Sequence, residues 1–275
     1  MYVDFEYANH RLSDFDCIMC NINTDSGLRE VNIGCDITFN TVKNNQSSLH
    51  KVTSSIYENV YTTTFEIMKN VCGKSQDEIY MTSIEARRLI KWLNRREYHQ
   101  FKIYSDDYET MSLVYFGSFN AQQIMLGDKI LGLSLTFTSN SPYALGDKKK
   151  IAFNISEENE KVYLYGDSDE YGVMYPITKI LFKQACDEFT IINHTTSTAV
   201  YLRNCLEGEM ITLDGEHKII LTDSDIHRQT IYNDFNYEYL NILIDESDFN
   251  ENEYEVSNPC LITIEYYPVR KVGVC

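Results

Sequence analysis

Two cysteines near the start of the chain have a spacing that zinc sites and redox pairs use. Cys17 and Cys20 are separated by Ile18 and Met19, and Cys-x-x-Cys is half of a typical zinc knuckle or a thiol–disulfide site. A knuckle needs a turn between the thiols, but this segment has no Gly or Pro and its apolar flanks continue a strand pattern. Residues three apart in a strand point to opposite faces, about 10 Å apart. We therefore expect Cys17 and Cys20 to share neither a metal nor a disulfide.

The other cysteines are scattered along the chain. They lie at positions 35, 72, 186, 205, 260 and 275, mostly among apolar or strand-like neighbours. No second Cys-x-x-Cys supplies the two further ligands that a zinc site requires. We expect all eight to be free thiols that behave as small hydrophobic residues.

An acidic stretch over residues 245–252 has some features of a calcium loop. Asp248, Asn250 and Asn252 fit the first positions of an EF-hand, but Glu253 replaces the required Gly and Pro259 replaces the bidentate Glu. A solvated acidic loop is the favoured interpretation, and an irregular Ca²⁺ site stays open as the alternative.

Enzyme motifs are absent from the sequence. The six histidines (10, 50, 99, 194, 217 and 227) form no metal-binding spacing, and no nucleophile elbow, Walker loop or dinucleotide fingerprint occurs. We predict no catalytic, cofactor-binding or metal-binding residues and no cofactor. The 21 tyrosines allow sugar stacking as an alternative role, although tyrosines at strand positions are ordinary. The single tryptophan, Trp92, is expected in the core.

Charge divides the chain into two parts. The formal net charge is −17; residues 1–150 hold 18 acids and 16 bases, whereas residues 151–275 hold 23 acids and 8 bases. This change in composition predicts two domains, 1–145 and 146–275.

A surface this acidic repels phosphates, which excludes specific nucleic-acid binding. No apolar run is long enough to span a membrane, and the first residues do not form a signal peptide, so we expect synthesis in a reducing cytoplasm.

Residues 82–96 carry the clearest helix signal. Thr82 and Glu85 form a capping box that satisfies free amides of the first turn. Arg95 and Arg96 suit the negative end of the helix dipole. The apolar residues expected on the buried side are Ile84, Leu89, Trp92 and Leu93.

The remaining signals are those of strands. Residues 131–138 alternate with period 2, and the strands 35–39 and 61–67, joined by the polar stretch 42–48, predict a hairpin arm or exposed loop. Residues 146–150 resemble a linker. Short strands are further predicted at 1–24 (two pieces), 101–104, 111–116, 161–165, 177–182, 189–193, 199–202, 210–213, 218–221 and 260–267. The Asp214-Gly215 step predicts a hairpin in the second half, which we expect to be a β-sandwich.

Several of these segments, in this order, resemble the distal tail protein of long-tailed phages of Gram-positive bacteria. The resemblance spans most of the chain and is strongest over residues 57–143. The segments that carry it are residues 9–15, 57–58 with 65–69, 90–93 with 101–103 and 106–107, 133–137 leading into 141–143, 234–237 and 262–267. The acidic residues 248–257 depart from the family pattern, which has a Gly-Asn step before its last strands.

The resemblance implies a mainly β fold with one prominent α-helix. The first domain would be a tail-tube-like β-sandwich with a helix that assembles into a sixfold ring, and the second a galectin-like or carbohydrate-module-like β-sandwich that projects outward. The function implied is structural: the ring joins the tail tube to the tail-tip hub, in the virion, and anchors adhesion components. The partners implied are five further copies, the tail tube protein, the tail-tip hub protein, and a receptor-binding protein or a host glycan.

The residues themselves agree with a role in assembly. The polar arm near residues 40–56 and exposed strand edges are suited to pairing with neighbouring copies, and a closed ring requires head-to-tail interfaces. Two alternatives stay open: another tail-tube or baseplate component, and a carbohydrate-binding module that recognises host glycans.

Overall fold

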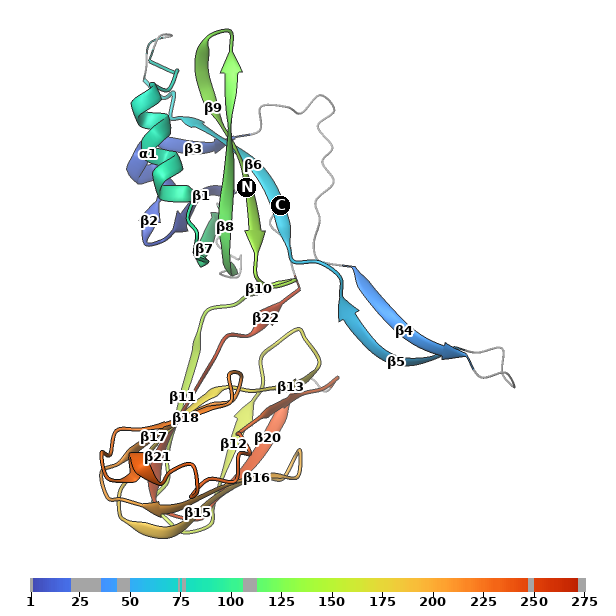
Figure 1. The fold of residues 1–275 in the computed structure, drawn as a ribbon, viewed down its shortest axis with the longest axis vertical. Coiled ribbons are helices and arrows are strands. Elements are labelled where there is room, and N and C mark those ends of the chain that lie inside the picture. Colours follow the sequence, from blue (N-terminus) through green and yellow to red (C-terminus); the bar gives the residue numbers. More distant parts are fainter. Residues whose placement is uncertain are drawn as a thin grey trace. The chain divides into compact units, whose positions relative to one another are not determined.

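Two compact units make up the chain in the computed structural model, which describes residues 2–20, 36–43, 50–73, 75, 78–105, 113–246 and 250–271. The first unit consists of Met1–Gly146 and Arg270–Cys275, and the second of Asp147–Val269. Each unit has its own hydrophobic core. Strands dominate both, and the described residues contain a single α-helix, so the predicted mainly β fold is confirmed (Figure 1).

One nine-stranded sheet forms the body of the first unit. Its strands follow the order β2-β1-β7-β8-β9-β6-β3, and β10 pairs with β8 and β22. A separate two-stranded sheet is made by β4 and β5. The bounds are β1 (Tyr2–Tyr7), β2 (His10–Arg11), β3 (Cys17–Cys20), β4 (Ile37–Lys43), β5 (His50–Tyr57), β6 (Thr62–Lys69), β7 (His99–Ser105), β8 (Leu113–Leu126), β9 (Lys129–Ser139), β10 (Ala144–Leu145) and β22 (Val269–Arg270), with a 3-10 turn η1 (Leu12–Phe15).

The helix α1 (Ser83–Leu93) begins at the predicted capping box. The Thr82 hydroxyl accepts the Glu85 N–H at 3.2 Å, and the Glu85 carboxylate accepts the Thr82 N–H at 2.7 Å. Two expectations were wrong. Ile84 is 74% exposed, because at 100° per residue it lies opposite Leu93. The helix also ends at Leu93, before residues 94–96, with Asn94 as its C-cap. The predicted interaction of Arg95 with the helix end is confirmed, because Arg95 Nε donates to the Trp92 carbonyl oxygen at 3.0 Å.

An aromatic cluster joins the helix to the sheet. Trp92, only 4% exposed, stacks on Phe15 with 4.5 Å between ring centroids and on Phe5 at 5.6 Å. Its indole Nε1–H donates to the Tyr7 carbonyl oxygen at 2.8 Å. The predicted core position of Trp92 is confirmed, and the side chain ties α1 to β1 and η1 by stacking and by one buried hydrogen bond.

The second unit is the expected β-sandwich. A five-stranded sheet, in the order β11-β21-β14-β17-β18, faces a four-stranded sheet, β12-β20-β15-β16, and β13 pairs with β19. The bounds are β11 (Lys149–Asn154), β12 (Glu160–Tyr165), β13 (Gly172–Met174), β14 (Ile177–Phe182), β15 (Cys186–Asn193), β16 (Thr198–Cys205), β17 (Met210–Asp214), β18 (Ile219–Thr222), β19 (Ile242–Ile244), β20 (Glu251–Val256) and β21 (Cys260–Tyr266), with a 3-10 turn η2 (His227–Gln229).

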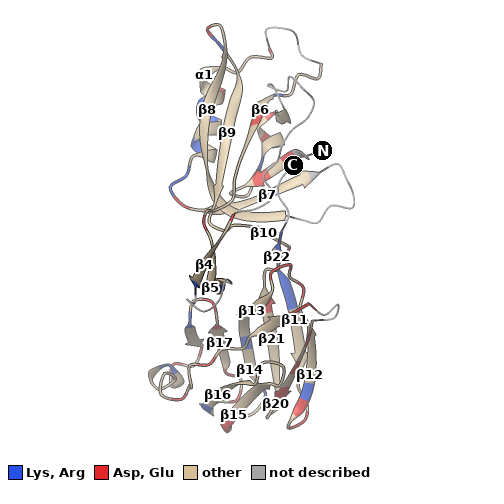
Figure 2. Cartoon of the chain, turned by 90° about the vertical axis from the view of Figure 1, so that its right-hand side faces the viewer, with Lys and Arg blue, Asp and Glu red and all other residues tan. Residues whose placement is uncertain are grey.

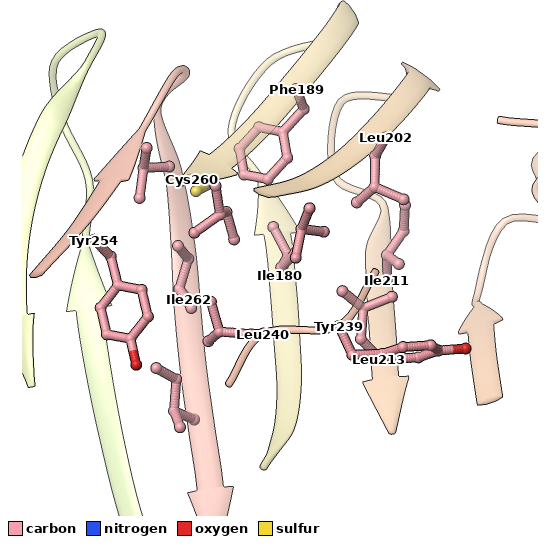
Figure 3. Close-up of a cluster of buried hydrophobic side chains, with 14 of the residues drawn as sticks. Ile180, Phe189, Leu202, Ile211, Leu213, Tyr239, Leu240, Tyr254, Cys260 and Ile262 are labelled. Atoms are coloured by element: carbon pink, nitrogen blue, oxygen red, sulfur yellow. The ribbon is translucent and has the colours of Figure 1, made fainter. Parts of the chain in front are cut away.

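Alternating side chains of the two sheets make the core of this sandwich. In β14, Ile180 and Phe182 point inward between half-buried neighbours, and Phe182 meets Phe189 of the other sheet edge-on at 4.9 Å. Figure 3 shows Ile180, Phe189, Leu202, Ile211 and Ile262 meeting in this core. The seven predicted strands and the hairpin β17–β18 after Asp214 are confirmed, because period-2 burial fixes each strand locally.

One strand pairing and one strand boundary differ from the sequence prediction. β4 pairs with β5, from Ile37↔Tyr57 to Lys43↔His50, and not with β6, which lies between β9 and β3. Strand pairing is a non-local property that periodicity does not report. Residues 149 and 150, assigned to a linker, instead begin β11, where Lys150 is the register partner of Glu265.

Candidate functional site

The thiols of the Cys-x-x-Cys segment lie in a strand, as expected. β3 pairs with β6 from Cys17↔Lys69 to Cys20↔Glu66. Cys17 is buried and Met19 packs against the same core, whereas Ile18 and Cys20 alternate to the other face. Burial, and then the nearby Glu66, raise the pKa of Cys20 to about 11. The thiol is therefore protonated at neutral pH, which makes it a poor nucleophile and metal ligand.

The acidic segment after β19 is partly built into the fold. Residues 247–249, including Asp248, lie outside the described residues. Asn252 is fully buried, and its amide oxygen accepts the Leu243 N–H at 2.8 Å while its amide nitrogen donates to the Leu243 carbonyl at 2.9 Å. Its oxygen therefore serves the backbone, and Asn252 does not belong to a solvated loop. Within the described ranges, no three His, Cys, Asp or Glu side chains gather to hold a metal ion.

A buried polar cluster, which sequence reasoning missed, lies in the second unit. His227 Nδ1 donates to Glu209 Oε1 at 2.7 Å, and both side chains are at most 2% exposed. Glu209 Oε2 accepts the Leu206 N–H at 2.9 Å, and Thr222 also donates to this carboxylate. His227 Nε2 lies 3.5 Å from Asp234. Glu209 thus bonds to His227, Thr222 and Leu206 and fastens η2 to β18 and to the residues before β17, whereas the buried His227 Nε2 has no hydrogen-bond partner among the described residues. No local sequence pattern predicts such a set.

The clearest candidate for function is the hairpin β4–β5. Its base is closed by the Glu58 N–H, which donates to the Asp36 carbonyl at 3.0 Å, and by an edge-on contact of Tyr57 with Tyr143 at 5.3 Å. A register shift at Asn40/Thr41 marks a bulge, which bends and twists a strand pair. The hairpin is thus anchored at residues 57 and 143, two positions that carry the family resemblance.

Apolar side chains on both faces of this hairpin are exposed. Phe39 and Val52 lie on one face and Val42 and Ile56 on the other, according to the register. The exposed fractions are Ile37 44%, Phe39 58%, Val42 58%, Val52 52% and Ile56 57%. An isolated two-stranded ribbon is marginally stable at best, and apolar groups gathered on exposed surface mark contact sites. The hairpin therefore has the composition of an element that another surface covers.

A second exposed feature is an uncharged polar face on strands β6, β9 and β8. The register aligns Thr62 with Thr138 and Ser118, and aligns Thr64 with Thr136 and Asn120. Figure 2 shows β8 and β9 almost entirely free of charged residues; Lys129 is the one charged residue in these two strands. We call the six aligned residues the polar face: Thr62, Thr64, Ser118, Asn120, Thr136 and Thr138. It offers hydroxyl and amide groups without positive charge.

The tip of the β8–β9 hairpin continues beyond the core. Burial declines along β8 from Leu113 to its end, where Met125 is 47% and Leu126 58% exposed. Lys129 lies over the Tyr80 ring, 4.7 Å from its centroid. The exposed apolar side chains of Met125 and Leu126 make this tip a second possible contact site for another protein surface.

In the second unit, carboxylates and tyrosines share the outer face of the four-stranded sheet. Tyr163 and Tyr165, 45% and 55% exposed, pair with Glu253 and Glu251. Lys161 Nζ lies 2.5 Å from Glu253 Oε1; this contact, followed by the Coulomb attraction of Lys161, lowers the pKa of Glu253. The face is acidic and aromatic, consistent with the charge imbalance of the sequence.

No helix of the described residues is long and apolar enough to cross a bilayer.

Comparison with known proteins defines the class. Residues 1–141 match a family model described as the phage tail protein N-terminal domain, and residues 143–266 match a model described as the phage tail C-terminal domain. The chain therefore belongs to this family of phage tail proteins and is a structural component of a phage tail. No curated protein matches it.

A solved phage tail protein has a similar fold. The SPP1 Dit (gp 19.1) protein, described as a paradigm of the hub adsorption apparatus in phages that infect Gram-positive bacteria, matches with a TM-score of 0.64 at 11% identity. The match covers 96% of this chain and 98% of that one. The predicted resemblance to the distal tail protein is thus confirmed at the level of the whole fold.

Proposed function

We propose that the protein is a distal tail protein: a sixfold ring at the tail tip that joins the tail tube to the tail-tip hub and anchors adhesion components. The observation that carries the proposal is the β4–β5 hairpin with exposed apolar side chains on both faces, in a chain of the phage tail family whose fold matches SPP1 Dit. Sixfold symmetry comes from the distal tail family that the sequence resembles. The protein has no catalytic role.

In this proposal the first unit, residues 1–145 by sequence, forms the ring and the second projects from it. The hairpin lies against the neighbouring copy, so that Phe39 and Val52 are covered on one side and Val42 and Ile56 on the other. A head-to-tail contact of this kind repeats around a closed ring. The polar face, which lacks Lys and Arg, suits a channel because it offers DNA phosphates no cation to bind.

The test is the mass and symmetry of the purified protein, by light scattering and negative-stain imaging, alone and with the tail tube protein. We expect rings of six 32.0 kDa chains. Phe39→Asp removes a buried aromatic contact from every interface and adds a charge, so assembly should weaken by at least about 30-fold. Ile226→Asp, at a side chain 79% exposed in the second unit, is the matched control and should assemble normally.

Three results would each contradict a different part of this proposal. A wild-type chain that stays monomeric even with the tail tube protein present contradicts the ring. Rings that form equally well from Phe39→Asp contradict the role of the hairpin while leaving the ring itself intact. A ring with another symmetry supports the alternative of a related tail-tube or baseplate component.

A second candidate function is glycan binding by the second unit. It is favoured by Tyr163 and Tyr165 beside Glu251 and Glu253, because exposed rings stack on apolar sugar faces and carboxylates accept sugar hydroxyls. Binding of the purified protein to host-surface polysaccharide, measured by calorimetry with Tyr165→Ala as the variant, tests it. Equal binding by wild type and variant rules out this face as the sugar site.

A further inference from the structure

Three of the described cysteines belong to the core of the second unit. Cys205 and Cys260 are at most 1% exposed, and Cys186 is half-buried and packs against the same core. Cys186 and Cys205 are register partners of β15 and β16. Because residues directly opposite each other in an antiparallel pair project from the same face of the sheet, these two thiols are neighbours.

The backbone geometry of this pair suits a disulfide. Opposed residues in antiparallel strands have Cα atoms about 4.5–5.5 Å apart, and disulfides span Cα separations of about 4.4–6.8 Å. The register of Cys186 and Cys205 therefore places the pair within the range that a disulfide spans. Cys17 and Cys20 are the contrast within this chain: they are close in sequence but lie on opposite faces of one strand.

We propose that Cys186 and Cys205 are a modification site at which a cross-strand disulfide forms when the folded protein meets a small disulfide oxidant. The Cys186 thiolate attacks one sulfur of the oxidant, forms a mixed disulfide and releases the other half as a thiolate. Cys205 Sγ then attacks Cys186 Sγ, loses its proton and releases the second half. Two protein thiols are oxidised by two electrons, and one oxidant disulfide is reduced to two thiols.

The order of these steps follows from the surroundings of the two thiols. Cys186 is the more exposed, so the oxidant reaches it first. A hydrogen bond from Cys205 lowers the pKa of Cys186, whereas the same bond, and then burial, raise the pKa of Cys205. The accessible partner is therefore the one that supplies the first thiolate.

The bond would have a function outside the cell. Thiols persist in a reducing cytoplasm, whereas disulfides persist in extracellular surroundings, and a phage tail protein meets both. A link between Cys186 and Cys205 closes a loop over residues 187–204 and joins β15 to β16, which stabilises the second unit after release of the particle. This inference does not depend on ring formation.

The experiment uses the wild-type protein in its folded state, treated with oxidised glutathione. Free thiols are then blocked in denaturant, and peptides are mapped by mass spectrometry without reduction. We expect a peptide carrying Cys186 linked to one carrying Cys205, and a rise in the Tm of the second unit of roughly 5–10 °C that reductant reverses. Cys17 and Cys20 are the internal control and should stay unlinked.

Two results would overturn the proposal. One is a link from either thiol to Cys260 in place of the Cys186–Cys205 link. The other is the absence of any link under conditions in which the exposed Cys72 becomes glutathionylated. In Cys205→Ala, Cys186 should keep the glutathione and the Tm rise should vanish; a rise that persists in this variant also refutes the assignment.

Discussion

Replacing the single tryptophan should weaken the first unit selectively. Trp92→Phe retains an aromatic ring against Phe15 and Phe5 but removes the indole N–H that donates to the Tyr7 carbonyl at 2.8 Å. Tyr7 is fully buried, so water cannot replace this donor. The substitution therefore tests whether that hydrogen bond and ring volume hold α1 against the sheet.

The magnitude can be worked from two contributions. A buried acceptor left without its donor costs about 1–3 kcal/mol. The smaller ring leaves part of the indole volume empty, which adds about 1 kcal/mol. The free energy of unfolding of the first unit should fall by about 3 kcal/mol, and its Tm by roughly 6–12 °C for a unit of this size.

The assay must resolve the two units. Trp92 is the only tryptophan, so fluorescence of the wild type reports unfolding of the first unit alone, and calorimetry supplies both transitions for the variant, which lacks tryptophan. The transition of the second unit is the internal control. A loss below about 0.5 kcal/mol, or an equal shift of both transitions, would refute the reasoning.

Two carboxylates should give pH-dependent stability with a defined sign. The Thr82 N–H, together with Lys69, lowers the pKa of Glu85 from 4.5 to about 2; Glu85→Gln should cost about 1 kcal/mol at pH 7, and this difference should vanish as pH falls from 4.5 to 2. Lys148, followed by Lys179, lowers the pKa of Glu265, whose side chain is 6% exposed and lies 2.6 and 3.1 Å from these amines. Glu265→Gln should lower the free energy of unfolding of the second unit by about 1–2 kcal/mol at pH 7, because the substitution removes the charge that pairs with the two amines. The loss stays this small because the exposed lysines can turn to solvent. The difference from wild type should disappear on acidification, when the carboxylate is protonated.

Urea unfolding of each variant across pH checks both expectations. A constant difference between wild type and Glu85→Gln from pH 7 to pH 2 would contradict the first. A Glu265→Gln protein as stable as wild type at pH 7, or one whose deficit grows on acidification, would contradict the second. Glu97→Gln, at an exposed residue, serves as a control that should change neither.

Local patterns in the sequence determined most of the secondary structure. The capping box of Thr82 and Glu85 satisfies amides within one turn, so it marks the start of α1 without reference to the rest of the chain. Strict alternation over residues 131–138 likewise predicts β9, since a strand with one buried face has apolar residues at every second position. The separation of Cys17 from Cys20 followed from the same rule.

Tertiary structure alone decided which segments meet. β4 pairs with β5 and not with β6, as the sequence had suggested. Asn252 is buried against the backbone of Leu243, although it lies in an acidic stretch that looks exposed in sequence. Periodicity reports which side of an element is buried, but pairing and register depend on contacts between residues distant in the chain. The two cysteine pairs show the difference: the obvious pair, Cys17 and Cys20, is held apart by its strand, whereas Cys186 and Cys205 are brought together by a register that no spacing reveals.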